Sequence, residues 1–265
     1  RIDVFLSANV LKNAMGVGIP GTGMVGLPIA IALGALVGKS EYGLEVLKDI
    51  TPADVENGKL LVAKKIIGIH LKDDIDEKLY IEVVGSKNQD VARTIISGEH
   101  TRFVFLELNQ EILLNLCEDK TTESKADQYE LSFDKVCEFA IETPIDEIRF
   151  IKKTVEVNKA AAEAALKGSY GHTIGQTLAN GKMGDSVYTH MLSVTAAACD
   201  ARMAGAMLPV MSNSGSGNQG IAATLPVSVF AEESGKSDEE LIRALALSHL
   251  MTIYIGSAEK QQTDY

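Results

Sequence analysis

The stretch Met211-Ser-Asn-Ser-Gly-Ser-Gly-Asn-Gln-Gly220 decides how the C-terminal half of this chain is interpreted. It combines three glycines, three serines, two asparagines and a glutamine between apolar segments that read as buried helices. Such a segment exposes backbone N–H groups and short polar side chains just before a helix, where a small anion such as a carboxylate or phosphate is favoured. The alternative, a flexible surface linker, stays open but fits the apolar flanks less well.

The composition indicates an ordinary globular protein of 265 residues, with 46% hydrophobic and 23% charged residues. That length accommodates one large domain or two ordinary ones. The net charge of −11 argues against partners such as nucleic acid or an anionic membrane surface. An anionic substrate would therefore have to be held by a local site.

The three cysteines, Cys117, Cys137 and Cys199, show no paired spacing and are odd in number. A disulfide framework is not expected, and a reducing, cytoplasmic location is predicted. The chain opens on a segment that reads as a strand and not as a secretory signal. The apolar run Pro28–Val37 is too short to span a bilayer.

The order of elements predicts an α+β fold with two domains. Residues 1–128 are expected to hold helices and a small antiparallel sheet. A strand over residues 2–7 is followed by a glycine-rich loop, Asn9–Gly26, and by an apolar helix, Leu27–Val37. Thr51-Pro52 then begins a helix that runs to about Ala63, because Thr is a good N-cap and Pro suits the first helical position.

An antiparallel meander follows in the sequence, because β-branched and aromatic residues alternate between polar breaks. Its predicted strands are Ile66–Leu71, Leu79–Val84, Val91–Ile96 and Thr101–Leu108. The polar stretch Glu118–Gln128 is interpreted as the boundary between the domains.

Residues 129–265 are predicted to form a mainly helical domain. Its predicted helices are Leu131–Glu142, Ile145–Lys167, Gly184–Ala206 and Leu241–Ile255. The last follows Ser237-Asp-Glu-Glu240, which has the spacing of a capping box.

Glycine patterns in residues 16–26 suggest nucleotide binding only weakly, because the phosphate-binding lysine and the ribose-binding acid are missing at the expected spacing. The alternatives are a tight turn that lets Pro28–Val37 pack closely, or a loop that helps to enclose a small ligand.

Three further residues carry alternative interpretations. Asp200 and Arg202 lie in an apolar helix, where they form either structural ion pairs or, for Arg202, a clamp for a carboxylate. His249, within a buried helix, is either a satisfied core histidine or a binding or catalytic residue. No Cys/His metal motif is present, so no metal ligand is assigned.

Six segments occur in an order that resembles one family. They are Lys12-Asn13, Gly16–Gly26, Gly43–Asp49, Asp200–Met203, Met211–Gly220 and Ala244–Leu250. Together they resemble the L-cysteine desulfidase family, which is related to the alpha region of iron–sulfur L-serine dehydratases. The resemblance covers most of the chain.

The resemblance implies a lyase that performs a β-elimination on a small L-amino acid. L-Cysteine would give sulfide, ammonia and pyruvate, and an L-serine dehydratase-like activity is the alternative. It also implies an oxygen-labile 4Fe–4S cluster held by three cysteines. A non-catalytic small-molecule-binding protein on the same scaffold is the further alternative, and a homo-oligomer stays open.

The chain departs from the family at two places. A segment that family members carry before the first strand is missing, and so is the segment with the cluster cysteines, near residues 255–256. We therefore expect a discontinuity there and assign none of Cys117, Cys137 and Cys199 to the cluster.

The predicted site combines the glycine- and asparagine-rich segment with a few residues elsewhere. The expected substrate-binding residues are Lys12, Asn13, Arg202, Asn213, Ser214, Ser216, Asn218 and Gln219. His249 is the expected catalytic residue, as a proton donor or an orienting group.

Overall fold

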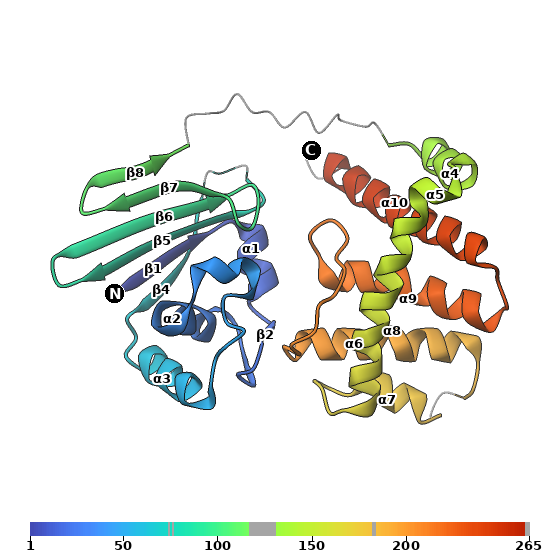
Figure 1. Cartoon of the computed structure of the whole chain (residues 1–265), viewed down its shortest axis with the longest axis horizontal. Coiled ribbons are helices and arrows are strands. Elements are labelled where there is room, and N and C mark those ends of the chain that lie inside the picture. Colours follow the sequence, from blue (N-terminus) through green and yellow to red (C-terminus); the bar gives the residue numbers. More distant parts are fainter. Residues whose placement is uncertain (74, 76, 117–130, 182–183, 263–265) are drawn as a thin grey trace. The chain divides into compact units, whose positions relative to one another are not determined.

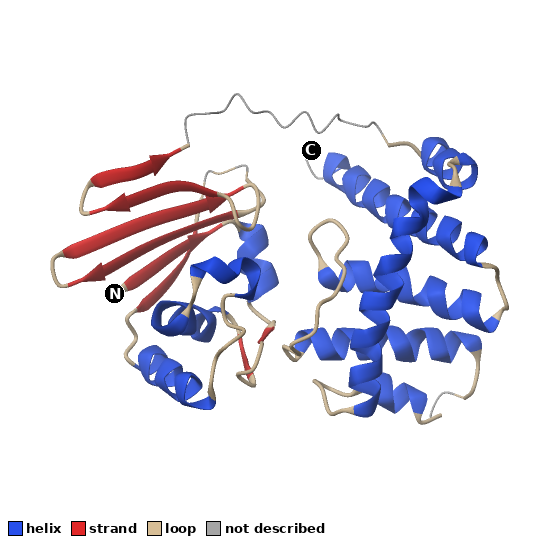
Figure 2. Cartoon of the chain, viewed as in Figure 1, coloured by secondary structure: helices blue, strands red, loops and turns tan. Residues whose placement is uncertain are grey.

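The computed structural model describes residues 1–265 except 74, 76, 117–130, 182–183 and 263–265. For residues 257–262 it describes the backbone only. The chain divides into two compact units, Arg1–Asp127 and Gln128–Tyr265, each described here by itself. Among the described residues, strands of a sheet lie in the first unit and the second is helical, so the predicted α+β class is confirmed (Figure 2). The predicted boundary Glu118–Gln128 lies entirely outside the described residues.

A six-stranded sheet forms the N-terminal unit, in the order β4-β1-β5-β6-β7-β8 (Figure 1). The strands are β1 (Ile2–Leu6), β4 (Ile67–Leu71), β5 (Tyr80–Lys87), β6 (Asp90–Ser97), β7 (Phe103–Leu108) and β8 (Glu111–Asn115). The predicted meander is found in β5 to β8, with β8 as an additional strand. The sheet is mixed, because β1 pairs in parallel with β4 and antiparallel with β5. The prediction of a purely antiparallel sheet, with the 66–71 strand in the meander, is therefore wrong.

The segment predicted as the loop Asn9–Gly26 is also corrected. It contains the helix α1 (Ala8–Ala14) and a short hairpin of β2 (Gly18–Ile19) and β3 (Met24–Val25). No residue of α1 is fully buried; Val10, Leu11 and Ala14 are half-buried at helical spacing, but seven residues are too few for the apolar periodicity by which a helix is detected in a sequence.

Two helices of this unit begin and end where the sequence predicts. α2 (Leu27–Val37) and α3 (Pro52–Ala63) pack against each other at Gly58, where an added Cβ would lie 2.9 Å from Ile29 Cδ1. α3 begins with a capping box, in which Thr51 Oγ1 accepts from the Asp54 N–H and the Asp54 carboxylate accepts from the Thr51 N–H. A 3₁₀ segment, η1 (Ser40–Glu45), connects the two helices.

The C-terminal unit packs helices through small residues. Its elements are α4 (Phe133–Glu142), α5 (Ile145–Ile148), η2 (Arg149–Lys152), α6 (Lys153–Lys167), α7 (Ile174–Ala179), α8 (Val187–Met203), α9 (Gly217–Glu233) and α10 (Asp238–Gln262). Ala161, Ala165, Ala198 and Ala201 form a core with Ile221 and other residues of α6, α8 and α9. Because alanine is short, these helices approach closely and bring the start of α9 next to α6 and α8.

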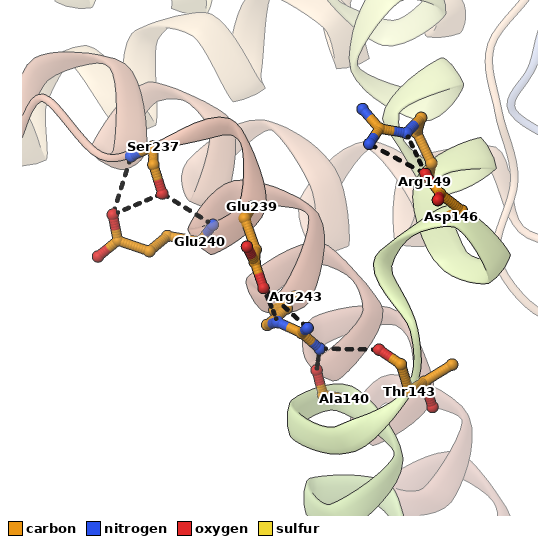
Figure 3. A network of polar contacts seen from close by, with 8 residues as sticks. All are labelled: Ala140, Thr143, Asp146, Arg149, Ser237, Glu239, Glu240 and Arg243. Atoms are coloured by element: carbon orange, nitrogen blue, oxygen red, sulfur yellow. Dashed lines mark hydrogen bonds and ion pairs between the residues drawn. The ribbon is translucent and has the colours of Figure 1, made fainter.

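α10 is fixed at its start by polar contacts (Figure 3). Ser237 and Glu240 form the predicted capping box, with the Ser237 N–H 2.8 Å from Glu240 Oε2. Arg243 donates to the carbonyl oxygens of Ala140 and Thr143 at the end of α4. α10 continues to Gln262, so the expected discontinuity near 255–256 is not visible as a break in the helix.

Candidate functional site

The Met211–Gly220 loop is fixed at both of its ends by one buried side chain, Asn158 of α6. The Asn158 side chain is fully buried. Its Oδ1 accepts from the Met211 N–H at 2.8 Å, and its Nδ2 lies 3.4 Å from the carbonyl oxygens of Met211 and of Gly220. A segment held in this way is a built part of the helical core, which contradicts the linker interpretation.

A tight turn occupies the middle of the loop. The backbones of Asn213 and Ser216 exchange two hydrogen bonds, of 3.1 and 2.9 Å, across Ser214 and Gly215. Both intervening residues have positive φ, 50° and 79°, as a two-residue hairpin turn of the primed type requires. Ser214 therefore lies exposed at the tip, and Ser216 is placed at the start of α9.

Glycine is required where α9 begins. Ser216 is the N-cap, and its Oγ accepts from the Gln219 N–H at 3.4 Å. An added Cβ at Gly220 would lie 2.0 Å from the Met211 carbonyl oxygen, and one at Gly217 would lie 2.3 Å from Arg202 Nε. The first close approach folds the loop against its own helix, and the second lets an arginine lie against the first turn of α9.

Arg202 of α8 brings a positive charge to that first turn. Its Nη1 donates to Asn218 Oδ1 at 3.1 Å and lies 3.3 Å from Met203 Sδ. Among the described residues no carboxylate forms an ion pair with Arg202. The first N–H groups of a helix carry partial positive charge, so a guanidinium placed there leaves an excess of positive charge that a small anion would balance.

Asp200 forms no ion pair among the described residues, so the structural ion pair that the sequence left open for it is not found. Its carboxylate is buried and accepts from the Gly175 N–H at 3.0 Å, at the start of α7. Asp200 thus caps a neighbouring helix, which leaves the charge of Arg202 free for a ligand.

His249 lies on the other side of the loop and is 8% exposed. Its Nδ1 is 3.0 Å from Asn213 Nδ2, and its Nε2 is 3.0 Å from Thr224 Oγ1. Burial lowers the pKa of His249, because an apolar environment disfavours the charged ring. Both ring nitrogens are therefore used inside the unit, and the predicted catalytic role of His249 stays a prediction.

A cavity of about 330 Å³ opens beside His249. Its polar wall is made by Ser212, Asn213, Ser214 and His249, and its apolar wall includes Phe139, Phe150, Ile151, Leu250 and Ile253. Arg202 and Asn218 do not line it. The structure therefore separates the predicted site residues into two groups, on the two sides of the Ser214-Gly215 turn.

The remaining predicted residues lie at different places. Gln219 is half-buried in the first turn of α9, where its backbone N–H donates to Ser216 Oγ. Lys12 and Asn13 belong to the N-terminal unit, where both are exposed on α1 and Asn13 contacts Asn9. Their predicted role in substrate binding stays a prediction.

Sequence reasoning missed Asn158 and Thr224, which are both fully buried. The available signal was an asparagine within the otherwise apolar side of a predicted helix and a threonine within an apolar run. A polar residue in such a position needs a partner, but the partner is distant in the chain and only the fold identifies it.

These features define an α+β protein whose helical unit places an arginine at the start of a helix, beside a polar loop held by a buried asparagine. The chain belongs to the serine dehydratase alpha chain family, which matches residues 41–261. The resemblance to the alpha region of iron–sulfur serine dehydratases is thereby confirmed.

Several bacterial relatives are similar over almost the whole chain. The UPF0597 protein of Bacteroides thetaiotaomicron is 61% identical over 259 residues, which are 96% of this chain and 60% of that protein. The UPF0597 protein of Parabacteroides distasonis is 60% identical over 269 residues, 96% of this chain and 61% of the relative. That of Shewanella halifaxensis is 46% identical over 269 residues, 98% of this chain and 61% of the relative.

The chain thus spans about three fifths of the length of these relatives. No solved structure shows significant similarity to it. Within the described part of the chain, no helix combines the length and the apolar character needed to cross a membrane.

The described residues do not fit the iron–sulfur cluster that the family implies. They contain no group of three metal-ligating side chains, and Cys137 and Cys199 are free thiols on different helices, α4 and α8. Burial raises the pKa of the Cys199 thiol, which disfavours the thiolate that an iron ligand requires. Cys117 lies outside the described residues.

Proposed function

We propose that the C-terminal unit binds the carboxylate of a small L-amino acid at the start of α9, as the substrate site of a β-eliminating lyase. The observation that carries the proposal is Arg202, a cation without an ion-pair partner among the described residues, held against Gly217 and bonded to Asn218. The family description, a serine dehydratase chain, gives the reaction class.

Both bonds that a β-elimination breaks lie close to the carboxylate, at the α-carbon and the β-carbon. A guanidinium can hold a carboxylate with two parallel hydrogen bonds, and the free N–H groups of a helix start can add further donors. Fixing the carboxylate in this way would orient the α-proton and the leaving group.

L-Serine and L-cysteine are both substrates that this site would accept, because they share the carboxylate and differ only in the β-substituent. L-Serine follows from the family description. The L-cysteine desulfidase activity, which releases sulfide, ammonia and pyruvate, is proposed from the sequence resemblance. A 4Fe–4S cluster is proposed on the same ground, and a location in the cytoplasm is proposed from the odd number and the spacing of the cysteines.

The test is an assay of the protein purified without oxygen, with L-serine and L-cysteine offered separately and pyruvate and sulfide measured. Arg202→Gln should lower kcat/KM for the preferred substrate by tenfold or more, on the order of the loss of one charged hydrogen bond. The matched control is Arg149→Gln, which removes an exposed guanidinium that pairs only with Asp146 in its own turn and should leave the rate unchanged.

A folded Arg202→Gln protein with full activity would contradict the proposal that Arg202 binds the substrate carboxylate. The second candidate is a non-catalytic small-molecule-binding protein on the same scaffold, which would hold if the full-length protein lacks the cluster cysteines. It predicts that L-serine or L-cysteine binds, that Arg202→Gln weakens the binding, and that no product forms.

A further inference from the structure

A second polar cluster lies behind the loop, and the proposed anion site does not use it. It consists of Asn158 and Thr224, both fully buried, with Asn213 at 5% and His249 at 8% exposure. These residues come from α6, α9, the loop and α10. None of the four is a carboxylate, a lysine or an arginine, so the cluster depends on how its hydrogen atoms are distributed.

The hydrogen atoms can be assigned from the acceptors. Thr224 Oγ1 accepts from Asn158 Nδ2 at 3.3 Å and lies 2.7 Å from the Gly220 carbonyl oxygen, which can only accept, so we assign the hydroxyl proton to this shortest contact. With the hydroxyl proton directed there, His249 Nε2, 3.0 Å from the same Oγ1, carries a proton and donates it. Nδ1 of a neutral ring is consequently an acceptor, and Asn213 Nδ2 donates to it at 3.0 Å.

The second N–H of the Asn213 amide completes the assignment. It donates to the His249 backbone oxygen at 3.1 Å, while Asn213 Oδ1 accepts from the Ser214 hydroxyl at 2.9 Å. A proton added at Nδ1 would face the Asn213 amide N–H, which is also a donor. Turning the amide over would place its oxygen against the His249 carbonyl and remove the acceptor of Ser214, so the cluster fits the neutral ring alone.

We propose that Thr224 and a neutral His249, with its proton on Nε2, are positioning residues that set the conformation of the Met211–Gly220 loop and thereby the anion site at the start of α9. The part that concerns substrate rests on the proposed function, whereas the part that concerns the loop does not.

A short path connects the cluster to Arg202. His249 holds the Asn213 side chain, and the Asn213 backbone closes the turn onto Ser216. Ser216 is the N-cap of α9, and the next residue, Gly217, lies directly against the Arg202 guanidinium. A shift of Asn213 would therefore move the first turn of α9 and its free N–H groups.

The environment of the ring favours the same state. The groups that face the ring nitrogens are the Asn213 amide and the Thr224 hydroxyl, and burial alone lowers the pKa of His249, with no contribution from a charged neighbour on α6, α9 or α10. The cluster therefore stays neutral around pH 7.

The chain offers a matched pair of substitutions. Thr224→Val keeps the shape of the side chain and removes the hydroxyl that bonds Gly220, His249 and Asn158, whereas Thr224→Ser retains it. Thr195→Val on α8 makes the same chemical change at a buried hydroxyl without a hydrogen-bond partner in the described structure, and is the control.

The first measurement is nitrogen NMR of uniformly ¹⁵N-labelled protein, which reports both the histidine rings and the backbone amides. We expect the His249 ring as the Nε2–H tautomer, without titration near the ordinary pKa, and altered Asn213 and Ser214 backbone amide signals in Thr224→Val only. A His249 ring protonated on Nδ1, or unchanged loop signals in Thr224→Val, would overturn the proposal.

The second measurement is the affinity for L-serine by calorimetry. Thr224→Val should weaken binding by about tenfold, the cost of one misplaced hydrogen bond, while Thr224→Ser and Thr195→Val retain it. Unchanged affinity in Thr224→Val also overturns the positioning role. If the wild-type protein fails to bind L-serine or L-cysteine while the NMR results hold, the proposed function fails and the assignment of the cluster to the loop stands.

Discussion

Two arginines of the C-terminal unit lie at opposite ends of helices. Arg243 lies at the end of α4, where it donates to the carbonyl oxygens of Ala140 and Thr143 and pairs with Glu239 (Figure 3). Arg202 belongs to the last turn of α8, but its guanidinium reaches the start of α9 and has an amide oxygen and a thioether as partners. The negative end of the α4 dipole favours the Arg243 guanidinium, whereas the positive start of α9 disfavours the Arg202 guanidinium unless an anion is bound there.

The difference teaches how a structural arginine is distinguished from a binding arginine. The acceptors of Arg243 in the described structure all belong to the chain itself, so its hydrogen bonds stabilise the fold. Arg202 keeps donors that the fold does not use, at a place where the fold itself is electropositive. Four experiments can break or sharpen this comparison.

The largest effect is expected from a methyl group at the start of α9. Gly220→Ala would place Cβ 2.0 Å from the Met211 carbonyl oxygen, which is backbone and cannot move without opening the loop. We expect a loss of about 3 kcal/mol in the free energy of unfolding, measured by urea denaturation. Gly217→Ala meets the flexible Arg202 side chain instead and should cost about 1 kcal/mol. Equal losses for the two variants would contradict the close packing of the loop on α9.

The second effect tests the structural arginine. Arg243→Ala removes the donor for two carbonyl groups at the end of α4, where the side chain is 27% exposed. We expect a loss of about 2 kcal/mol in urea denaturation followed by circular dichroism. Arg149→Ala is the control, because its carboxylate partner is highly exposed and its loss should be under about 0.5 kcal/mol. A stable Arg243→Ala protein would remove one side of the comparison.

The third effect concerns pH and the polar cluster behind the loop. Burial lowers the pKa of His249, so the unfolded chain binds more protons than the native one between the native pKa and the ordinary value of 6.5. The stability that the neutral ring contributes is present above pH 6.5 and is lost as the pH falls through the native pKa.

Histidine variants separate this contribution from the rest of the protein. The free energy of unfolding of wild type should fall from pH 7 to pH 5, and His249→Gln should reduce this slope. The control is His190→Gln: Glu233 raises the pKa of His190, so its contribution has the opposite sign, present below pH 6.5 and lost as the pH rises through the native pKa. If His249→Gln leaves the pH dependence of the free energy of unfolding unchanged, the pKa of the His249 ring does not differ between the native and the unfolded protein.

The smallest effect on stability is expected for the binding arginine. Arg202→Gln should change the free energy of unfolding by less than about 0.5 kcal/mol, because no ion pair within the described structure is broken. We expect sulfate to raise the melting temperature of the wild-type protein more than chloride does, because sulfate binds at Arg202. Arg202→Gln should abolish this difference between the two salts. A large loss of stability without any anion effect would make Arg202 structural, like Arg243.

Local chemistry made several elements predictable. α2 and α3 begin and end as expected, because glycine and proline punctuate α2 and a capping box begins α3. The same holds for the start of α10 at Ser237. The parallel pairing of β1 with β4 was not predictable, because it joins residues far apart in the chain that carry no shared local signal. α1 was missed because its seven residues are too few to show a clear apolar period.

The sequence by itself determined the α+β class, the family and the position of the polar loop before an apolar helix. These features were predictable because helix caps, glycines and apolar runs are local signals, each readable from a short stretch of residues. Only the tertiary structure decided that the loop is closed by Asn158, that its predicted site residues fall into two groups, and that Arg202 faces a helix start. Hydrogen bonds and helix-end electrostatics act over a few ångströms, and the folding of α6, α8, α9 and α10 around one alanine-rich core brings their atoms within that range.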